Sequence, residues 1–248
     1  MTCILVGIRC SGKIQVVTMG IEYYITDIES LGLSVQIHDI NQISVLRISD
    51  NKQITHNIKV KHPNVYSKEA LEVQGITPAD LKKGLPLEDV VDSVDSFFSE
   101  DGQKNNEGRC MIAYNAPFDR KFIHAAWDSV GKVFGPNLWF CSMAFAKRYV
   151  AKHGGEKIAQ AQIDALIDGI KTDKKSGKLK PKFGLNNFMT GVGLPIKTGA
   201  HNAEVDVQNT LELYKWLIAS GTEYVSLIER IPHKEIKVSS QDLDVDDF

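Results

Sequence analysis

The segment 23–30, with the sequence YYITDIES, constrains the fold of this chain more than any other stretch. Its tyrosine, isoleucine and threonine residues favour a β-strand, and a strand directs residues i and i+2 to the same face. Asp27 and Glu29 are therefore expected side by side near the end of a strand. Two carboxylates so close repel each other, and a hard divalent cation relieves that repulsion. A single D-x-E pair nevertheless fits an acidic turn better than a metal site, so other residues must decide between the two.

Composition limits the classes of function that this chain can have. With 248 residues, 43 % of them hydrophobic and 24 % charged, it is long enough for one large α/β domain or two small ones. The net charge of −2 indicates no general attraction for nucleic acid, so such binding would require a local basic patch or a metal. The four cysteines are scattered without a C-x-x-C pair, and no apolar run reaches membrane-spanning length. Both features favour a cytoplasmic protein without a membrane partner.

Residues 1–20 contain a pattern, from Gly7 to Lys13, that satisfies G-x4-G-K. A nucleotide-binding P-loop then requires Ser or Thr at the start of a helix. Ile14 occupies that position instead, and β-prone residues follow it. We therefore expect residues 1–20 to form a β-hairpin, or an extension upstream of a natural start at Met19, rather than a nucleotide site.

The segments that follow predict an α/β domain over residues 21–220. Two further strands, 40–48 and 53–60, are separated by turn-forming residues, so the sheet is expected to begin with three antiparallel strands. Pro117 is expected to exclude Ala116 from the helix that follows it. Apolar periodicity and capping residues predict the remaining elements: a short helix over 77–84, helix 87–98, strand 109–114, a helix from Phe118 or Asp119 to Val130, strand 138–141, helices 142–150 and 185–192, and a helix that the segment 200–206 opens and that ends near Ala219.

Two of the predicted helices carry a single acid on an otherwise largely apolar face. Asp119 shares its face with Phe122 and Ile123, and Asp206 shares its face with Leu213. An acid at the start of a helix also interacts favourably with the helix dipole, which is an alternative role for Asp119. His201 precedes the last helix and is expected on a loop.

Together these residues form three motifs in the order and at the spacing of a known superfamily. DIESLG at 27–32 resembles D-x-E-[ST]-x-G, NAPFD at 115–119 resembles N-x-x-F-D, and HNAEVD at 201–206 resembles H-x-A-x-x-D. Residues 21–219, apart from an insertion at 151–182, are thus similar to the DEDDh (DnaQ-like) 3′–5′ exonucleases, which include polymerase proofreading subunits, ribonuclease T and exonuclease I. The resemblance implies an RNase H-like α/β fold with a mixed five-stranded sheet, its first three strands antiparallel, and helices on both faces.

The resemblance also implies the chemistry of the site. Four carboxylates would hold two Mg2+ or Mn2+ ions, which stabilise the attacking and leaving oxygens of a phosphodiester. Asp27 would bridge both ions, with Glu29 and Asp206 completing the first site. Asp119 would hold the second ion. His201 would take a proton from the attacking water, because an imidazole has an ordinary pKa near 6.5.

The same resemblance implies a set of substrate contacts. Ser30 and Leu31 are expected to meet the terminal nucleotide. Phe118 is placed to stack on a base, although a core role fits it as well. Gln74 stands where many relatives have histidine, and Gln42 stands where relatives often have glutamate. The complete predicted set of substrate-binding residues is Ser30, Leu31, Gln74, Ile76, Asn115 and Phe118.

The implied function is the release of nucleoside 5′-monophosphates from the 3′ ends of single-stranded DNA. Within the enzyme class, the alternative is a 3′–5′ exoribonuclease that trims RNA or short oligonucleotides. From another class, the alternative is a catalytically silent nucleic-acid-binding module. The presence of all four acids and the histidine argues against the silent module.

Two further segments leave alternatives open. Residues 151–182 form a lysine-rich insertion, which could be a solvated loop or an arm that contacts phosphates. Residues 221–248 are expected to form a C-terminal helix and an acidic disordered tail. The end of this tail faintly resembles a sliding-clamp peptide and the tails of single-strand-binding proteins. It is therefore a candidate contact for a replication protein, while a solubilising role fits it better.

Overall fold

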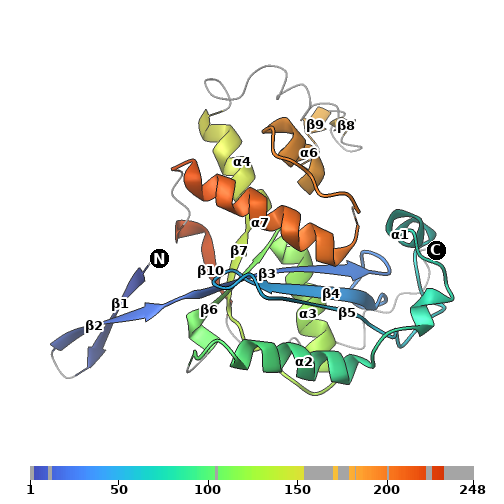
Figure 1. Ribbon diagram of the computed structural model, residues 1–248, viewed down its shortest axis with the longest axis horizontal. Coiled ribbons are helices and arrows are strands. Elements are labelled where there is room, and N and C mark those ends of the chain that lie inside the picture. The colour runs from blue at the N-terminus through green and yellow to red at the C-terminus, as the bar shows by residue number, and fades with distance from the viewer. Residues whose placement is uncertain are drawn as a thin grey trace.

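A six-stranded mixed β-sheet forms the centre of the molecule (Figure 1). The computed structural model describes residues 3–10, 13–103, 106–153, 170–172, 179–181, 183–199, 201–221 and 225–231 of the chain. In spatial order the strands are β10 (Ile228–Arg230), β7 (Leu138–Cys141), β6 (Arg109–Ala113), β3 (Glu22–Ser30), β4 (Ile40–Arg47) and β5 (Gln53–Asn57). β3, β6 and β7 are parallel, whereas β4 is antiparallel to both of its neighbours and β10 is antiparallel to β7.

The three consecutive strands β3, β4 and β5 confirm the predicted antiparallel start of the sheet. A tight turn joins β4 to β5. In this turn the Asp50 carboxylate accepts a hydrogen bond from the Lys52 amide at 3.1 Å, and Asn51 adopts a φ of 57°. Asparagine tolerates this left-handed conformation better than most residues do.

The prediction of a five-stranded sheet is wrong by one strand. β10 extends the sheet beyond β7 and pairs Ile228 with Phe140 and Arg230 with Leu138. Three residues are too few to show the alternation of polar and apolar side chains on which strand prediction depends. β10 forms at the edge of β7, where unpaired backbone groups accept another strand.

Helices cover both faces of the sheet, as predicted (Figure 1). The described helices are α1 (Lys68–Gln74), α2 (Leu87–Ser99), α3 (Ala116–Ser129), α4 (Ser142–His153), α6 (Leu185–Gly191) and α7 (Ala203–Ala219), with 3-10 turns at Asp80–Lys82, Asn106–Gly108 and Val225–Leu227. α2 and α3 share a core with Tyr24 and Ile28 of β3, whereas α4, α6 and α7 share a second core with Ile25. Alternate residues of β3 therefore enter opposite cores, which fixes the register of the strand. None of the described helices is long and apolar enough to cross a membrane.

Two helix starts differ from the predictions. α1 is absent from the predicted elements, although Ser67 caps it by accepting a hydrogen bond from the Ala70 amide at 3.4 Å and Gly75 ends it with a φ of 66°. α3 begins at Ala116, so the predicted exclusion of Ala116 is wrong. Pro117 lies in the first turn, where a helix has no internal acceptor for the N–H that proline lacks.

The predicted helix over 77–84 is reduced to a 3-10 turn. The Asp80 carboxylate accepts hydrogen bonds from the amide and the hydroxyl of Thr77, at 2.9 and 2.6 Å. These bonds cap the start of the segment, and Gly84, with a φ of 100°, ends it after one turn.

Two separate hairpins lie outside the central sheet: β1 (Cys3–Cys10) with β2 (Lys13–Gly20), and β8 (Ile170–Thr172) with β9 (Leu179–Pro181). Lys13 begins a strand rather than a helix, so the segment from Gly7 to Lys13 lacks the geometry of a P-loop. Most of the predicted insertion at 151–182, and the predicted tail from 232 on, lie outside the described residues.

Candidate active site

The end of β3 presents two carboxylates on the face of the sheet that α7 covers. Because Ile28 enters the core beneath α2 and α3, its neighbours Asp27 and Glu29 point to the opposite face. Glu29 lies directly opposite Gln42 of β4. A register irregularity between Glu29 and Ser30 then interrupts the ladder, and such bulges reorient side chains beside functional sites.

The first turn of α3 supplies a third carboxylate, that of Asp119, whose residue is 3 % exposed. β6 lies parallel to β3 and beside it, so the helix after β6 begins at the edge of the sheet where β3 ends. Asp119 lies on the inward face of α3 with Phe122 and Ile123, as predicted. The carboxylate of Asp119 lies close enough to that of Asp27 for the two to repel each other.

The segment before α7 supplies a histidine, and its first turns supply the fourth carboxylate. The Asp206 carboxylate accepts a hydrogen bond from the His201 backbone amide at 3.0 Å. His201 lies on a loop, as predicted, and has a φ of 62°, a conformation that non-glycine residues adopt only at a cost of about 1 kcal/mol or more. One ligand atom each from Glu29, His201 and Asp206 lies within 4.8 Å of the others.

The four carboxylates form one electrostatic group, here named the acidic cluster: Asp27, Glu29, Asp119 and Asp206. Burial raises the pKa of Glu29 to about 8, and repulsion from Asp206 and then Asp119 adds to this rise. Burial raises the pKa of Asp119 to about 7. Burial also raises the pKa of Asp27 well above its ordinary value, with the largest repulsion coming from Asp119. Burial raises the pKa of Asp206 as well, although the bond from His201 opposes this rise.

These side chains and the fold that holds them match a known family. The model of the RNase T family, described as Exonuclease, matches residues 24–214. The match covers more than half of the chain and includes the whole acidic cluster and His201. The chain belongs to the RNase T exonuclease family. This membership confirms the resemblance to the 3′–5′ exonuclease superfamily.

Individual relatives of this exonuclease domain are longer proteins. Over 103 residues this chain is 30 % identical to a DNA polymerase III of PolC type from Mycoplasmopsis pulmonis. The match covers 41 % of this chain and 7 % of the polymerase. The zinc-bound complex of E. coli exonuclease I with single-stranded DNA has the same fold, with a TM-score of 0.59 and 18 % identity over 82 % of this chain and 41 % of that one. A complex of exonuclease I with a dT13 oligonucleotide gives a TM-score of 0.60 and 17 % identity over 79 % and 41 %. The chain thus spans about two fifths of the length of exonuclease I.

The donor atoms of this RNase T family member fit divalent metal ions. Glu29 and Asp206 offer two carboxylates at a distance that a single ion could bridge, and a ring nitrogen of His201 lies within 4.8 Å of an oxygen of each. Asp27 and Asp119 add two carboxylates that interact electrostatically with this group. Carboxylates crowded in this way raise one another's pKa values, and a bound cation would favour their ionised forms.

The predicted substrate residues Ser30, Leu31, Gln74 and Ile76 come together at the loop after β3. Gln74 donates a hydrogen bond from Nε2 to the Ser30 carbonyl at 2.9 Å. The Leu31 side chain has no exposed surface and packs in a small core that Ile76 also contacts. Its backbone amide and carbonyl are hydrogen-bonded within the chain. Burial thus makes Leu31 a core residue, and its contact with a terminal nucleotide stays a prediction.

The other two predicted substrate residues lie at the start of α3. Asn115 is exposed, and its carbonyl accepts a hydrogen bond from the Phe118 amide at 2.8 Å. Phe118 is half-buried, and its ring lies 4.9 Å from that of Phe122. Part of the Phe118 ring packs against the core while part stays accessible, so both predicted roles fit this position.

Two glutamines that hold the start of α7 are missing from the predicted site. Gln42 accepts a hydrogen bond from the Ala203 amide, and Gln53 donates one to the Glu204 carbonyl. The sequence pattern that could have identified Gln42 is the alternation of side chains along a strand. Gln42 lies opposite Glu29, so it shares the face of the sheet that carries the acids. Their bonding partners lie more than 150 residues away in sequence, and for that reason no local pattern identifies them.

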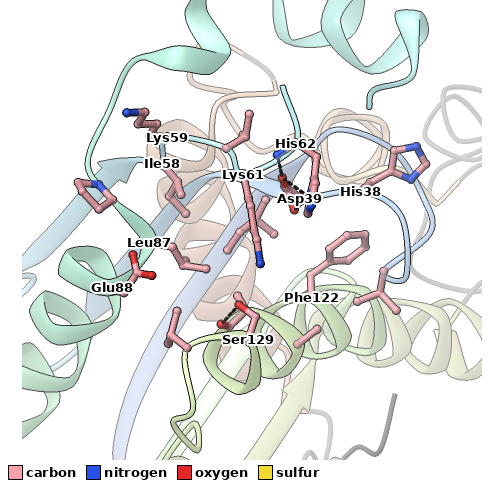
Figure 2. A pocket seen from close by; sticks show the side chains of 17 residues that line it. His38, Asp39, Ile58, Lys59, Lys61, His62, Leu87, Glu88, Phe122 and Ser129 are labelled. Atoms are coloured by element: carbon pink, nitrogen blue, oxygen red, sulfur yellow. Dashed lines mark hydrogen bonds and ion pairs between the residues drawn. The ribbon is translucent and has the colours of Figure 1, made fainter. Parts of the chain in front are cut away.

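A cavity of about 550 Å³ lies on the other face of the sheet (Figure 2). It is lined by α3, by the start of α2 and by residues from 35–40 and 58–62, including Lys61 and an ion pair of 3.3 Å between His62 and Asp39. No member of the acidic cluster lines it, so this cavity is separate from the candidate active site.

Proposed function

We propose that this chain is a metal-dependent 3′–5′ exonuclease of the DEDDh type, which hydrolyses phosphodiester bonds of DNA and releases nucleoside 5′-monophosphates. The observation that carries this proposal is the convergence of four carboxylates and a histidine from three distant segments. A stable fold gains nothing from placing four mutually repelling acids together, because each raised pKa reports an electrostatic cost. A requirement for bound cations explains why this arrangement exists.

The acidic cluster would hold two ions, Mg2+ or Mn2+. When bound, they would stabilise the negative charge on the attacking and leaving oxygens of the phosphodiester. The strongest repulsions divide the cluster into two pairs, Asp27 with Asp119 and Glu29 with Asp206. Two pairs of carboxylates match a site for two cations. Asp27 is repelled by all three other carboxylates, which fits the bridging role that we assign to it.

His201 is assigned the role of general base. It is exposed, and a ring nitrogen lies close to the carboxylates of Glu29 and Asp206, where an attacking water would be held. The bond between its own amide and Asp206 fixes the backbone, so the ring projects from a fixed point of the loop. Its exposure gives the accepted proton a path to solvent.

Replacing His201 with asparagine is expected to lower kcat about 10²- to 10³-fold, because general-base catalysis typically contributes 10²- to 10⁴-fold. Metal binding by the carboxylates should remain within about threefold of the parent, which titration calorimetry with Mn2+ measures. His56, which bonds to Ser93 on α2, offers a matched control. Activity of the His201 variant equal to that of a His56→Asn variant would contradict the assignment.

DNA is the proposed substrate, in the form of single-stranded 3′ ends. Its support is the likeness to exonuclease I, whose structures contain single-stranded DNA oligonucleotides. The alternative is RNA trimming, which the name of the RNase T family keeps open. A replication protein that binds the tail is a further proposal, and the tail lies outside the described residues.

The direct test uses 5′-labelled single strands of DNA and RNA of matched sequence, with Mg2+ or with EDTA. We expect a ladder of products shortened from the 3′ end, formed faster on DNA and abolished by EDTA. Faster shortening of RNA would favour the exoribonuclease. Binding of DNA and RNA without any release of nucleotides that depends on Mg2+ or Mn2+ would refute the proposed exonuclease activity. It would favour the catalytically silent nucleic-acid-binding module.

A further inference from the structure

All four amides at the start of α7 have acceptors, and one acceptor comes from a distant strand. Asn202 satisfies three of them: its side chain accepts from the Glu204 amide at 3.0 Å, and its carbonyl accepts from the next two amides, both at 2.9 Å. The remaining amide, that of the buried Ala203, donates to Oε1 of Gln42 at 2.7 Å. The Asp206 amide makes an ordinary helical bond to the Asn202 carbonyl, whereas the Ala203 amide is one for which a helix has no internal acceptor. Gln42 therefore acts as a second cap, supplied by β4.

The orientation of the Gln42 amide is fixed at both of its ends. Its Nε2 donates to Oδ1 of Asn57 on β5 at 2.9 Å, so its Oε1 must face the helix. Gln42 on β4 also lies directly opposite Glu29 on the neighbouring strand β3. The same side chain is thus the neighbour of one acid across the sheet and the cap of the helix that carries another, Asp206.

A second glutamine contacts the next residue of the helix. Gln53 of β5 donates from Nε2 to the Glu204 carbonyl at 3.0 Å and to the Ser44 hydroxyl at 2.8 Å. Its Oε1 accepts a hydrogen bond from Gln208, one turn further along α7. The first two turns of α7 are therefore held against β4 and β5 by amide groups.

We propose that Gln42 is a positioning residue of the active site, which sets the Asp206 and His201 segment at its distance from Glu29. This inference rests on the proposed exonuclease function. The ligand atoms of these three residues lie within 4.8 Å of one another, so a shift of about 1 Å would disturb both ion binding and the placement of the base.

The test compares two substitutions at Gln42 in the full chain. Gln42→Met keeps the length of the side chain but removes the acceptor. We expect kcat for Mg2+-dependent release to fall about 10- to 100-fold, in the range seen when groups behind metal ligands are removed, with KM for single-stranded DNA changed less than threefold. Hydrogen exchange of the Ala203 and His201 amides, followed by NMR, should accelerate at least about tenfold. Gln42→Glu, whose carboxylate accepts the same bond, should restore slow exchange and most of kcat.

Gln103→Met is the matched control. Gln103 donates to the Gly20 carbonyl near the opposite end of β3, so this variant loses a comparable bond away from the site. It should keep both kcat and the exchange rates of α7. Unchanged exchange in Gln42→Met, or faster exchange with kcat within twofold of the parent, would overturn the positioning role. If the parent chain itself releases no nucleotide, the proposed function fails, and a Gln42→Met variant with unchanged exchange and unchanged Mn2+ affinity would separately overturn this inference.

Discussion

Asp27→Asn is expected to lower the rate of Mg2+-dependent nucleotide release at least about 10³-fold, which corresponds to about 4 kcal/mol of transition-state stabilisation. Asp27 interacts with the three other carboxylates, so it is the acid whose charge both halves of the cluster share. Asparagine has nearly the same shape but carries no charge, and the variant should therefore hold neither ion in place. The measurement is single-turnover release from a 5′-labelled DNA strand at saturating enzyme.

The fold of the Asp27→Asn variant should be intact, because the substitution removes a buried charge that the neighbouring carboxylates repel. Asp92→Asn is the matched control, since Asp92 is an exposed aspartate on α2 that pairs with Lys132. It should retain full activity. Release by Asp27→Asn within tenfold of the Asp92 variant, with both proteins folded by circular dichroism, would refute the assignment of Asp27 to the active site.

Asp119→Asn is expected to stabilise the metal-free protein at pH 8 and not at pH 5. The pKa of Asp119 is about 7 in the folded chain and about 4 in an unfolded one. The folded state therefore binds more protons between these values, and its free energy of unfolding falls as pH rises through this window. At pH 8 the parent bears the cost of a buried charge that asparagine lacks. We expect a difference of about 2 kcal/mol, or a rise in Tm of about 4–8 °C.

Divalent ions should make the parent more stable than the Asp119→Asn variant at pH 8. Millimolar Mn2+ should raise the Tm of the parent at pH 8, because the ion binds the folded chain and not the unfolded one, and it should raise that of the Asp119 variant much less. The comparison is thermal unfolding in EDTA and in Mn2+, at pH 5 and pH 8. Taking the difference between variant and parent cancels other titrating groups, such as His56, whose lowered pKa favours the folded state at higher pH. A variant that is less stable than the parent in EDTA at pH 8 would contradict the picture of a repelled cluster.

Local sequence patterns predicted most of the secondary structure. Strand 138–141 and helix 87–98 lie within one residue of β7 and α2, because apolar periodicity over a few turns or a few alternations is a local property. The same reasoning missed β10, which is too short to carry a period. It also misplaced the start of α3. The residue before a proline usually avoids the helical conformation, but a proline in the first turn of a helix is well tolerated, and Ala116 begins the helix here.

The sequence by itself determined which residue types could do chemistry here: two acids at a strand end, one acid on an inward helix face, and a histidine five residues before another acid. Only the tertiary structure decided that these groups meet, that Leu31 belongs to the core, and that Gln42 caps α7. The physical reason is range. Propensity, capping and periodicity act within a few residues along the chain, whereas burial, Coulomb repulsion and hydrogen bonds between strands and helices depend on distance in space. The acidic cluster therefore acquires its raised pKa values only when folding brings its three segments together.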